Sequence, residues 1–300
     1  MNTNVTIAGV TFNNPVTTAS GTFGSGMEYS EYVDLSKLGA VTTKGVSSIP
    51  WPGNPTPRVA ETYGGMLNAI GLQNPGVEVF IKRDIPFLRQ QKAKIIVNVV
   101  GKTTEEYCDV VERLADCDVD MLEINISCPN VKEGGIAFGQ DPRCVEAITT
   151  EIKKRAKQPV IMKLSPNVTD ITEMAKAAEA GGADALSLIN TLTGMKIDIH
   201  RRAFLLANKT GGLSGPAIKP VAVRMVYQVA NAVKLPLIGM GGIVGAEDAL
   251  EFIMAGASMV AVGTTNFINP SATPEVVRGI EEYMKKYNIS DIHELIGCVK

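Results

Sequence analysis

Short strand-like runs recur along the chain, and this recurrence most strongly constrains the fold. Each run is β-branched or apolar, ends in polar or glycine residues, and is followed by a segment with helical periodicity. The runs are Val16–Ser20, Ala40–Lys44, Ile95–Val99, Met121–Ile126, Val160–Leu164, Ala185–Asn190, Pro236–Met240 and Met259–Gly263. Strand and helix alternating eight times predict an α/β protein built as a parallel (β/α)₈ barrel, the TIM barrel.

Three of the intervening helices carry recognisable start or stop signals. Thr103–Ala115 opens with a threonine cap and acidic residues, which the positive end of a helix prefers. Thr169–Ala180 is followed by Gly181 and Gly182, and Ala246–Met254 ends near Gly256. The alternative is a doubly wound open sheet. It is disfavoured because no first strand runs into a G-x-G-x-x-G turn with an acidic residue roughly 20 positions later.

The chain length and three long connections refine this prediction. Barrels of roughly 250 residues are common as one domain, so residues 1–300 are predicted to form a single domain. The long connections follow the second, fourth and sixth strands, at Gly45–Lys94, Ser127–Asp141 and Thr191–Pro216. Loops after barrel strands lie on the catalytic face, so these insertions predict walls and a lid for a buried substrate. The segment Thr3–Asn14 is expected to form a hairpin at the barrel bottom, with Phe12–Pro15 as a turn.

Composition excludes several classes of function. The net charge of −2 offers no electrostatic basis for binding nucleic acid or an anionic membrane. No apolar run reaches the roughly 20 residues of a membrane helix, and the N-terminal sequence does not resemble a signal peptide. The five cysteines include no C-x-x-C pair and there are two histidines, so neither disulfides nor a metal site is expected. A reducing cytoplasm fits this cysteine usage.

The residues that end the predicted strands are amides, lysines, a thiol and glycines, with no Asp or Glu among them. This set is poor at holding a divalent metal but suited to hydrogen-bonding a planar heterocycle. Lys44 and Lys163 end otherwise apolar runs, and a buried lysine is costly unless paired. Each could reach solvent or pair with a carboxylate. Two such lysines without an acidic partner at neighbouring strand ends favour an anionic ligand, such as a reduced flavin or a substrate carboxylate.

The last two predicted strands end in glycines, in PLIGMGGI and MVAVGTTNF. Glycine lets backbone N–H groups approach a ligand closely, and loops after strands seven and eight form the usual phosphate site of this fold. A tight turn alone would also explain each glycine. Their occurrence at both expected places indicates a ligand that bears phosphate.

Cys128 differs from the other four cysteines by its place in the chain. A lone cysteine is more often an inert small hydrophobe than a catalyst, and Cys108, Cys117, Cys144 and Cys298 fit that description. Cys128 instead follows a strand end, precedes a proline and leads a glycine-containing loop. A thiol with a reference pKa of about 8.5 can act as a base over an acidic C–H. Without an adjacent histidine, acid–base work is favoured over acyl transfer.

Several motifs together resemble dihydroorotate dehydrogenase along essentially the whole chain and in that family's order. They are TASGTFG, TTKGV, NAIGLQNPG, NISCPNVKEGGIAFG, INTLTGM, GMGGI and VGTT. The cysteine in SCPN resembles class 1, whose active-site base is cysteine, whereas class 2 carries serine there. The continuation VKEGGIAFG is more similar to the NAD-linked class 1B than to the fumarate-linked class 1A.

The resemblance implies an activity and a set of roles. Cys128 would remove the C5 proton of dihydroorotate while hydride leaves C6 for FMN, giving orotate for pyrimidine (UMP) biosynthesis. The implied substrate-binding residues are Lys44, Asn68, Ala69, Ile70, Gly71, Leu72, Asn125, Asn190 and Thr191. The implied FMN-binding residues are Ser20, Lys44, Gly45, Asn98, Asn125, Lys163, Ile189, Gly215, Gly241, Gly242, Gly263 and Thr264.

Class 1B also implies partners. The catalytic chain, with one FMN, pairs there with an electron-transfer subunit that carries FAD and a [2Fe–2S] cluster and passes electrons to NAD⁺. A homodimer of this chain joined by two partner subunits, a heterotetramer, is implied in the same way. No cysteine spacing in this chain could hold such a cluster. The competing hypotheses are the class 1A enzyme, a flavin-free phosphate-binding barrel lyase or isomerase, and a non-catalytic sensor of a phosphate ligand.

Overall fold

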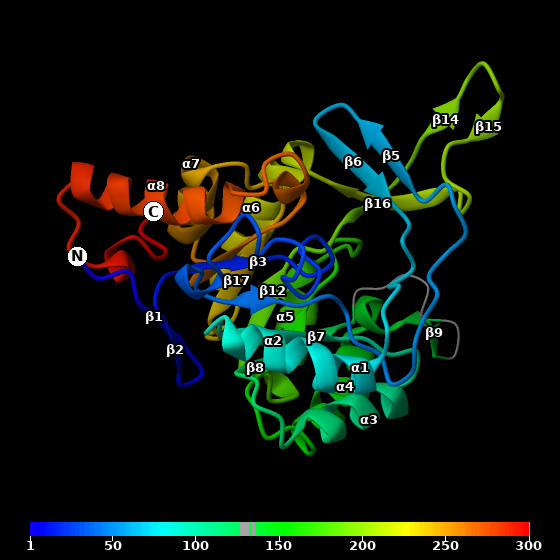
Figure 1. Cartoon of the computed structure of the whole chain (residues 1–300), viewed down its shortest axis with the longest axis horizontal. Helices are drawn as coiled ribbons and strands as arrows, with labels where there is room; N and C mark the ends of the chain where they lie inside the picture. The colour runs from blue at the N-terminus through cyan, green and yellow to red at the C-terminus, as the bar shows by residue number, and fades with distance from the viewer. Residues whose placement is uncertain (127–131, 134–135, 300) are drawn as a thin grey trace.

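The computed structural model describes residues 1–126, 132–133 and 136–299, and its centre is a parallel eight-stranded barrel (Figure 1). The barrel strands are β3 (Val16–Thr18), β4 (Val41–Thr42), β7 (Ile95–Val99), β8 (Met121–Asn125), β11 (Val160–Lys163), β12 (Ala185–Leu188), β17 (Leu237–Met240) and β18 (Met259–Val262). They are ordered β3-β18-β17-β12-β11-β8-β7-β4. Each lies inside one of the eight predicted runs, so the predicted (β/α)₈ barrel is confirmed.

The barrel closes between β3 and β4 largely through side-chain hydrogen bonds. Thr17 forms an isolated parallel bridge with Ala40, and its hydroxyl donates to the Ala40 carbonyl at 3.0 Å. The Thr18 hydroxyl donates to the Thr42 carbonyl at 3.2 Å and accepts from the Thr42 amide at 3.0 Å. Threonine side chains therefore satisfy backbone groups that a longer strand ladder would otherwise pair.

Thr18→Val is expected to lower the free energy of unfolding by about 1–3 kcal/mol, because it leaves a buried amide and carbonyl of Thr42 without these partners. Chemical denaturation monitored by circular dichroism measures the change. Thr11→Val is the matched control because Thr11 is exposed, and it should change stability by less than about 0.5 kcal/mol. Equal losses in the two variants would show that the β3–β4 closure does not depend on this hydroxyl.

Helices surround the barrel (Figure 1). They are α1 (Val77–Val79), α2 (Ile85–Gln90), α3 (Thr104–Leu114), α4 (Pro142–Lys153), α5 (Ile171–Ala180), α6 (Lys219–Ala230), α7 (Ala246–Met254) and α8 (Ala272–Lys286). The predicted cap of α3 is confirmed, since the Thr103 side chain accepts from the Glu106 amide. Helix α7 has the predicted bounds, and α5 begins two residues later than predicted because Asp170 is its N-cap. A π-helical segment, Phe80–Asp84, joins α1 directly to α2. Short 3₁₀ turns occur at Leu35–Lys37, Phe138–Gln140, Pro216–Ile218, Thr264–Phe267 and Ile292–Glu294.

The long insertions after the second and sixth barrel strands pair with each other. The first contributes β5 (Val59–Thr62) and β6 (Gly65–Asn68), and the second contributes β13 (Leu192–Met195) and β16 (Thr210–Ser214). They form one antiparallel sheet in the order β13-β16-β6-β5. The fourth-strand insertion contains the two-residue strands β9 (Lys132–Glu133) and β10 (Ile136–Ala137). The predicted insertions are therefore confirmed, while the shared sheet was not predicted.

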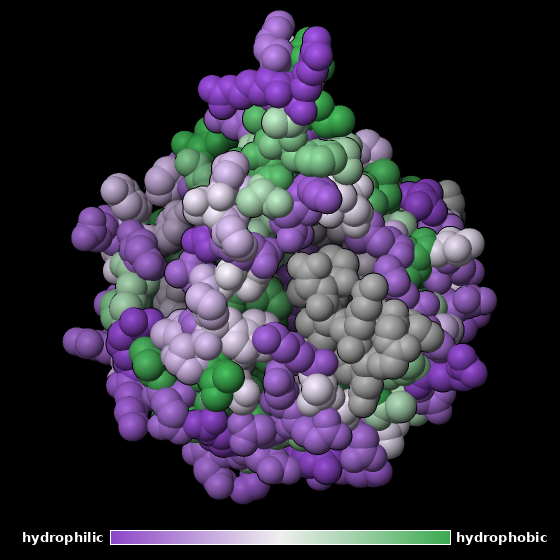
Figure 2. All heavy atoms as spheres, turned by 90° about the vertical axis from the view of Figure 1, so that its right-hand side faces the viewer, coloured by the Kyte–Doolittle hydropathy of each residue, from purple (hydrophilic) through white to green (hydrophobic). Residues whose placement is uncertain are grey.

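A narrow arm extends beyond this sheet. It contains β14 (Ile197–Asp198) and β15 (Ala203–Phe204), and it projects from the body of the molecule in Figure 1 and at the top of Figure 2. The face seen in Figure 2 is mostly hydrophilic, with hydrophobic residues scattered over it. Among the described residues, no helix is both long and apolar enough to cross a membrane.

The predicted N-terminal hairpin is confirmed, but its turn is at a different place. Strands β1 (Val5–Ile7) and β2 (Val10–Phe12) are antiparallel, and Ala8 and Gly9 both have positive φ, as a two-residue hairpin loop requires. Phe12 is fully buried in β2, so the expected turn at Phe12–Pro15 is wrong; residues 13–15 form a bend that leads into β3. The hairpin thus lies beside the amino end of β3, and its buried side chains join the main core.

Candidate active site

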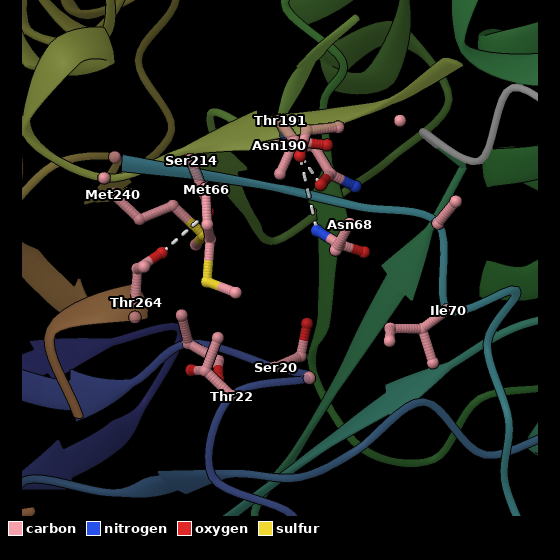
Figure 3. A pocket seen from close by; sticks show the side chains of 18 of the residues that line it. Ser20, Thr22, Met66, Asn68, Ile70, Asn190, Thr191, Ser214, Met240 and Thr264 are labelled. Atoms are coloured by element: carbon pink, nitrogen blue, oxygen red, sulfur yellow. Dashed lines mark hydrogen bonds between the residues drawn. The ribbon is translucent and has the colours of Figure 1, made fainter. Parts of the chain in front are cut away.

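A cavity of about 820 Å³ opens at the carboxyl ends of the barrel strands, beneath the sheet built by the insertions. Every predicted site residue that lies in the described part of the chain lines this cavity. Figure 3 shows side chains from β6, the strand ends and the insertion sheet pointing into it. Cys128 lies outside the described residues. It follows Asn125, the last residue of β8 and part of the cavity wall, by three positions.

One end of the cavity presents a row of carboxamides. The Asn190 amide donates to Asn125 Oδ1 at 3.5 Å, and the Asn125 amide donates to Asn98 Oδ1 at 3.5 Å. Across the cavity, Asn68 on β6 donates to the Gly212 carbonyl at 3.4 Å (Figure 3). Since each carboxamide both donates and accepts, this row matches a flat ligand that carries imide or lactam groups.

Lys163 lies at the end of β11 and is almost fully buried. Its ammonium donates to Ser20 Oγ at 2.9 Å and lies 3.8 Å from Glu123 Oε2. The prediction that both lysines lack an acidic partner is therefore wrong for Lys163. Glu123 was not predicted as a partner of Lys163 because it lies two residues before the end of β8, inside the apolar run MLEIN.

Lys44 has a different electrostatic environment. Burial lowers the pKa of its ammonium, and the nearby positive charges of Arg58 and Lys163 lower it further. Within residues 1–126, 132–133 and 136–299, no carboxylate forms an ion pair with Lys44. An anionic group of a ligand would stabilise the charged form of this lysine, so Lys44 is suited to bind a carboxylate.

The other end of the cavity is built from glycines and hydroxyl groups. Gly215, Gly241 and Gly242 have φ values of 103°, 127° and 85°, which favour glycine. Thr264 Oγ1 donates to Ser214 Oγ at 2.8 Å, and Thr22 faces the same space (Figure 3). Among the described lining residues the cations are Lys44 and Lys163, both at the carboxamide end. Hydroxyl groups and the backbone of these glycines are therefore what this end offers to an anion.

The resemblance noted in the sequence implies that this end of the cavity holds the phosphate of FMN. On that expectation, Gly242→Ala should weaken FMN binding about tenfold, because the substitution imposes positive-φ strain and crowds the cradle. An added Cβ would lie 2.8 Å from Lys219 Cβ and 2.9 Å from the Gly215 carbonyl. Fluorescence titration of the apoprotein with FMN measures the affinity. Gly245→Ala is the control, since an added Cβ there meets no atom within 4 Å. Unchanged affinity in Gly242→Ala would contradict this assignment of the glycine end.

Comparison with known proteins identifies the family. The family model described as dihydroorotate dehydrogenase matches residues 2–284. The chain belongs to the dihydroorotate dehydrogenase family. A protein of Lachnoclostridium phytofermentans is 78% identical over 300 residues, covering 100% of both chains. One from Alkaliphilus oremlandii is 68% identical over 296 residues, covering 99% of this chain and 98% of the other. Both are named dihydroorotate dehydrogenase B (NAD(+)), catalytic subunit.

Several residues that line the cavity of this dihydroorotate dehydrogenase family member were not predicted from the sequence. Asn167 follows β11 and supports the cavity wall: its amide donates to the Thr191 carbonyl at 3.0 Å and its oxygen accepts from the Thr193 amide at 2.9 Å. The signal for Asn167 was present, since it follows the predicted fifth strand in SPN. Met66 and Met240 place their side chains in the cavity (Figure 3), and nothing in their local sequence marks them as site residues. In the described part of the chain, no group of three His, Cys, Asp or Glu side chains could hold a metal ion.

Proposed function

We propose that this chain is the catalytic subunit of an NAD⁺-linked dihydroorotate dehydrogenase, which oxidises (S)-dihydroorotate to orotate in de novo pyrimidine biosynthesis. The observation that carries the proposal is one cavity with carboxamides and two lysines at one end and a glycine–hydroxyl cradle at the other. The two relatives at 78% and 68% identity bear the name of this activity. Residues 1–300 would act as one FMN-binding domain, located in the cytoplasm.

The cavity residues fit FMN. Its phosphate would be held by Gly215, Gly241, Gly242, Gly263 and Thr264. At Gly215 and Gly242 an added Cβ would lie within 3 Å of backbone atoms, so this part of the cavity wall requires glycine. Ser20, Gly45, Asn98, Lys163 and Ile189 would contact the ring and the ribityl chain. The Lys163 charge would stabilise negative charge on the ring system. When bound, FMN supplies a two-electron acceptor for hydride.

The remaining cavity residues fit dihydroorotate. Asn68, Asn125 and Asn190 would pair with the ring amides, and Thr191 would add a hydroxyl. Lys44, also beside the ring of FMN, would bind the substrate carboxylate, in keeping with its uncompensated charge. Residues 69–72 (Ala69, Ile70, Gly71 and Leu72) would line one side of the substrate-binding site.

Cys128 is the proposed base. The Cys128 thiolate would take the proton from C5 and become a thiol, the hydride from C6 would go to the flavin as the two-electron acceptor, and a double bond would form between C5 and C6. The atoms and charges balance, since the proton and the hydride together are the two hydrogens removed. Cys128 follows the cavity residue Asn125 by three positions in the chain, and this nearness supports the proposal that its thiol reaches bound substrate.

The electrons are proposed to leave through a second protein. An iron–sulfur FAD subunit would carry them to NAD⁺, and two of these would join a homodimer of this chain in a heterotetramer. The words "catalytic subunit" and "NAD(+)" in the names of the relatives support this proposal. The sequence spacing of the cysteines offers no cluster site on this chain.

Coupled turnover tests the proposal. Dihydroorotate-dependent reduction of NAD⁺ should require both this chain and the co-purified iron–sulfur flavoprotein. Direct reduction of fumarate by the chain alone would instead indicate the class 1A activity. A purified chain that stays colourless after addition of FMN would contradict the flavoenzyme proposal and favour a flavin-free barrel lyase or isomerase.

A further inference from the structure

We propose that Glu123 is a positioning residue that compensates the buried charge of Lys163 and fixes the orientation of the Asn98 amide at the flavin site. The inference rests on the proposed function, because it concerns how this chain tunes a bound FMN. Glu123 does not line the cavity and therefore acts through residues that do.

The register of the barrel places these groups on four adjacent strands. Asn98 on β7 is the Cα partner of Glu123 on β8. Lys163 on β11 is the partner of both Asn125 on β8 and Ser187 on β12. Alternate residues of a barrel strand face the interior, so Glu123 lies one interior layer below Asn125.

Among the described residues, the polar contacts of the Glu123 carboxylate all connect it to this layer or to the cavity wall above it. Oε2 accepts from Asn98 Nδ2 at 2.6 Å, and Oε1 accepts from Ser187 Oγ at 2.7 Å. Lys163 Nζ lies 3.8 Å from Oε2. The Glu123 side chain is 2% exposed and that of Lys163 is 5% exposed, so solvent screens this pair little.

The bond from Asn98 Nδ2 determines which way the amide points. With its nitrogen held by Glu123, its oxygen is directed toward Asn125, which donates to it at 3.5 Å. The Asn98 oxygen also lies close to Gly45: a Cβ added at Gly45 would be 3.2 Å from it. Glu123 thereby sets the donor and acceptor pattern that the cavity presents at Asn98.

The charge of Glu123 has a separate consequence. The Lys163 cation favours the anionic reduced flavin, and the nearby carboxylate opposes that effect. Glu123 therefore holds the flavin reduction potential below the value that Lys163 alone would produce. Glu123→Gln removes the negative charge but keeps the shape. The glutamine oxygen can still accept from Asn98, and its amide can donate to the Ser187 hydroxyl.

The test uses the full chain loaded with FMN and measures the reduction potential and the FMN dissociation constant. Glu123→Gln should increase the equilibrium constant for flavin reduction about tenfold, a rise of about 30 mV for a two-electron couple. Ser187→Ala is the matched control, because it removes one hydrogen bond and no charge; its equilibrium constant should stay within about twofold of the unsubstituted chain. An unchanged potential in Glu123→Gln, or an equal rise in Ser187→Ala, overturns the inference.

Folding provides a second test if Glu123→Gln is insoluble. The variant with both Glu123→Gln and Lys163→Gln carries no buried charge at this place, so it should be soluble and more stable than Glu123→Gln alone. A double variant as insoluble as the single one overturns the inference. The two proposals fail differently: an unsubstituted chain that binds no FMN overturns both, whereas a normal unsubstituted chain with an unchanged Glu123→Gln potential overturns only the role of Glu123.

Discussion

Cys128→Ala is expected to retain FMN but to slow flavin reduction by dihydroorotate at neutral pH by at least about 100-fold, the usual contribution of a general base. The C5 proton then has no acceptor, while the groups that would bind FMN and the substrate ring are unchanged. Anaerobic stopped-flow absorbance at the flavin band measures this rate directly.

Two further variants sharpen this prediction. Cys128→Ser should recover part of the rate only at higher pH, because a hydroxyl is far less acidic than a thiol with a reference pKa of about 8.5. Cys298→Ala is the control, since Cys298 is an exposed thiol near the C-terminus. Normal neutral-pH bleaching of the flavin in Cys128→Ala would refute the assignment of Cys128 as the base.

Lys163→Ala is expected to weaken FMN binding about 100-fold and to lower the reduction potential of the FMN that remains bound. The first effect follows from the loss of a buried ammonium at the cavity wall. The second follows because the Glu123 carboxylate, 3.8 Å from Lys163, is left without its counter-charge. For the same reason the free energy of unfolding should fall by roughly 3–5 kcal/mol.

Lys153→Ala is the matched control for Lys163→Ala. Lys153 also pairs with a carboxylate, Asp184, but it lies on helix α4 outside the cavity. Its replacement should leave the FMN affinity and the potential unchanged. FMN titration and a redox titration against a reference dye give both quantities. An unchanged affinity and potential in Lys163→Ala would remove Lys163 from the flavin site.

The sequence was sufficient to predict the barrel because its signals are local. Each of the eight strands is a short apolar run with a polar or glycine end, and the ends of parallel barrel strands converge on one face. Ser20 and Thr264 are far apart in the chain, but each follows a strand, so the sequence predicts that they share one site; both line the same cavity.

The features that the sequence did not predict depend on contacts between distant segments. The pairing of β6 with β16 joins residues about 145 positions apart, and no local pattern specifies which insertion strand meets which. Glu123 was not predicted because its partners Asn98, Lys163 and Ser187 lie on three other strands. An acidic residue inside an apolar run does not indicate which residues the fold places beside it. The hairpin turn was misplaced because Asn13, Asn14 and Pro15 are stronger turn residues than Ala8 and Gly9.

An anaerobic absorbance spectrum of the purified, FMN-loaded chain before and after addition of dihydroorotate is the most direct test of the proposed function. We expect an oxidised flavin spectrum that bleaches on addition of stoichiometric dihydroorotate, with orotate recovered in equal amount. A flavin that stays oxidised in the presence of excess dihydroorotate, or a chain that binds no flavin, would contradict it.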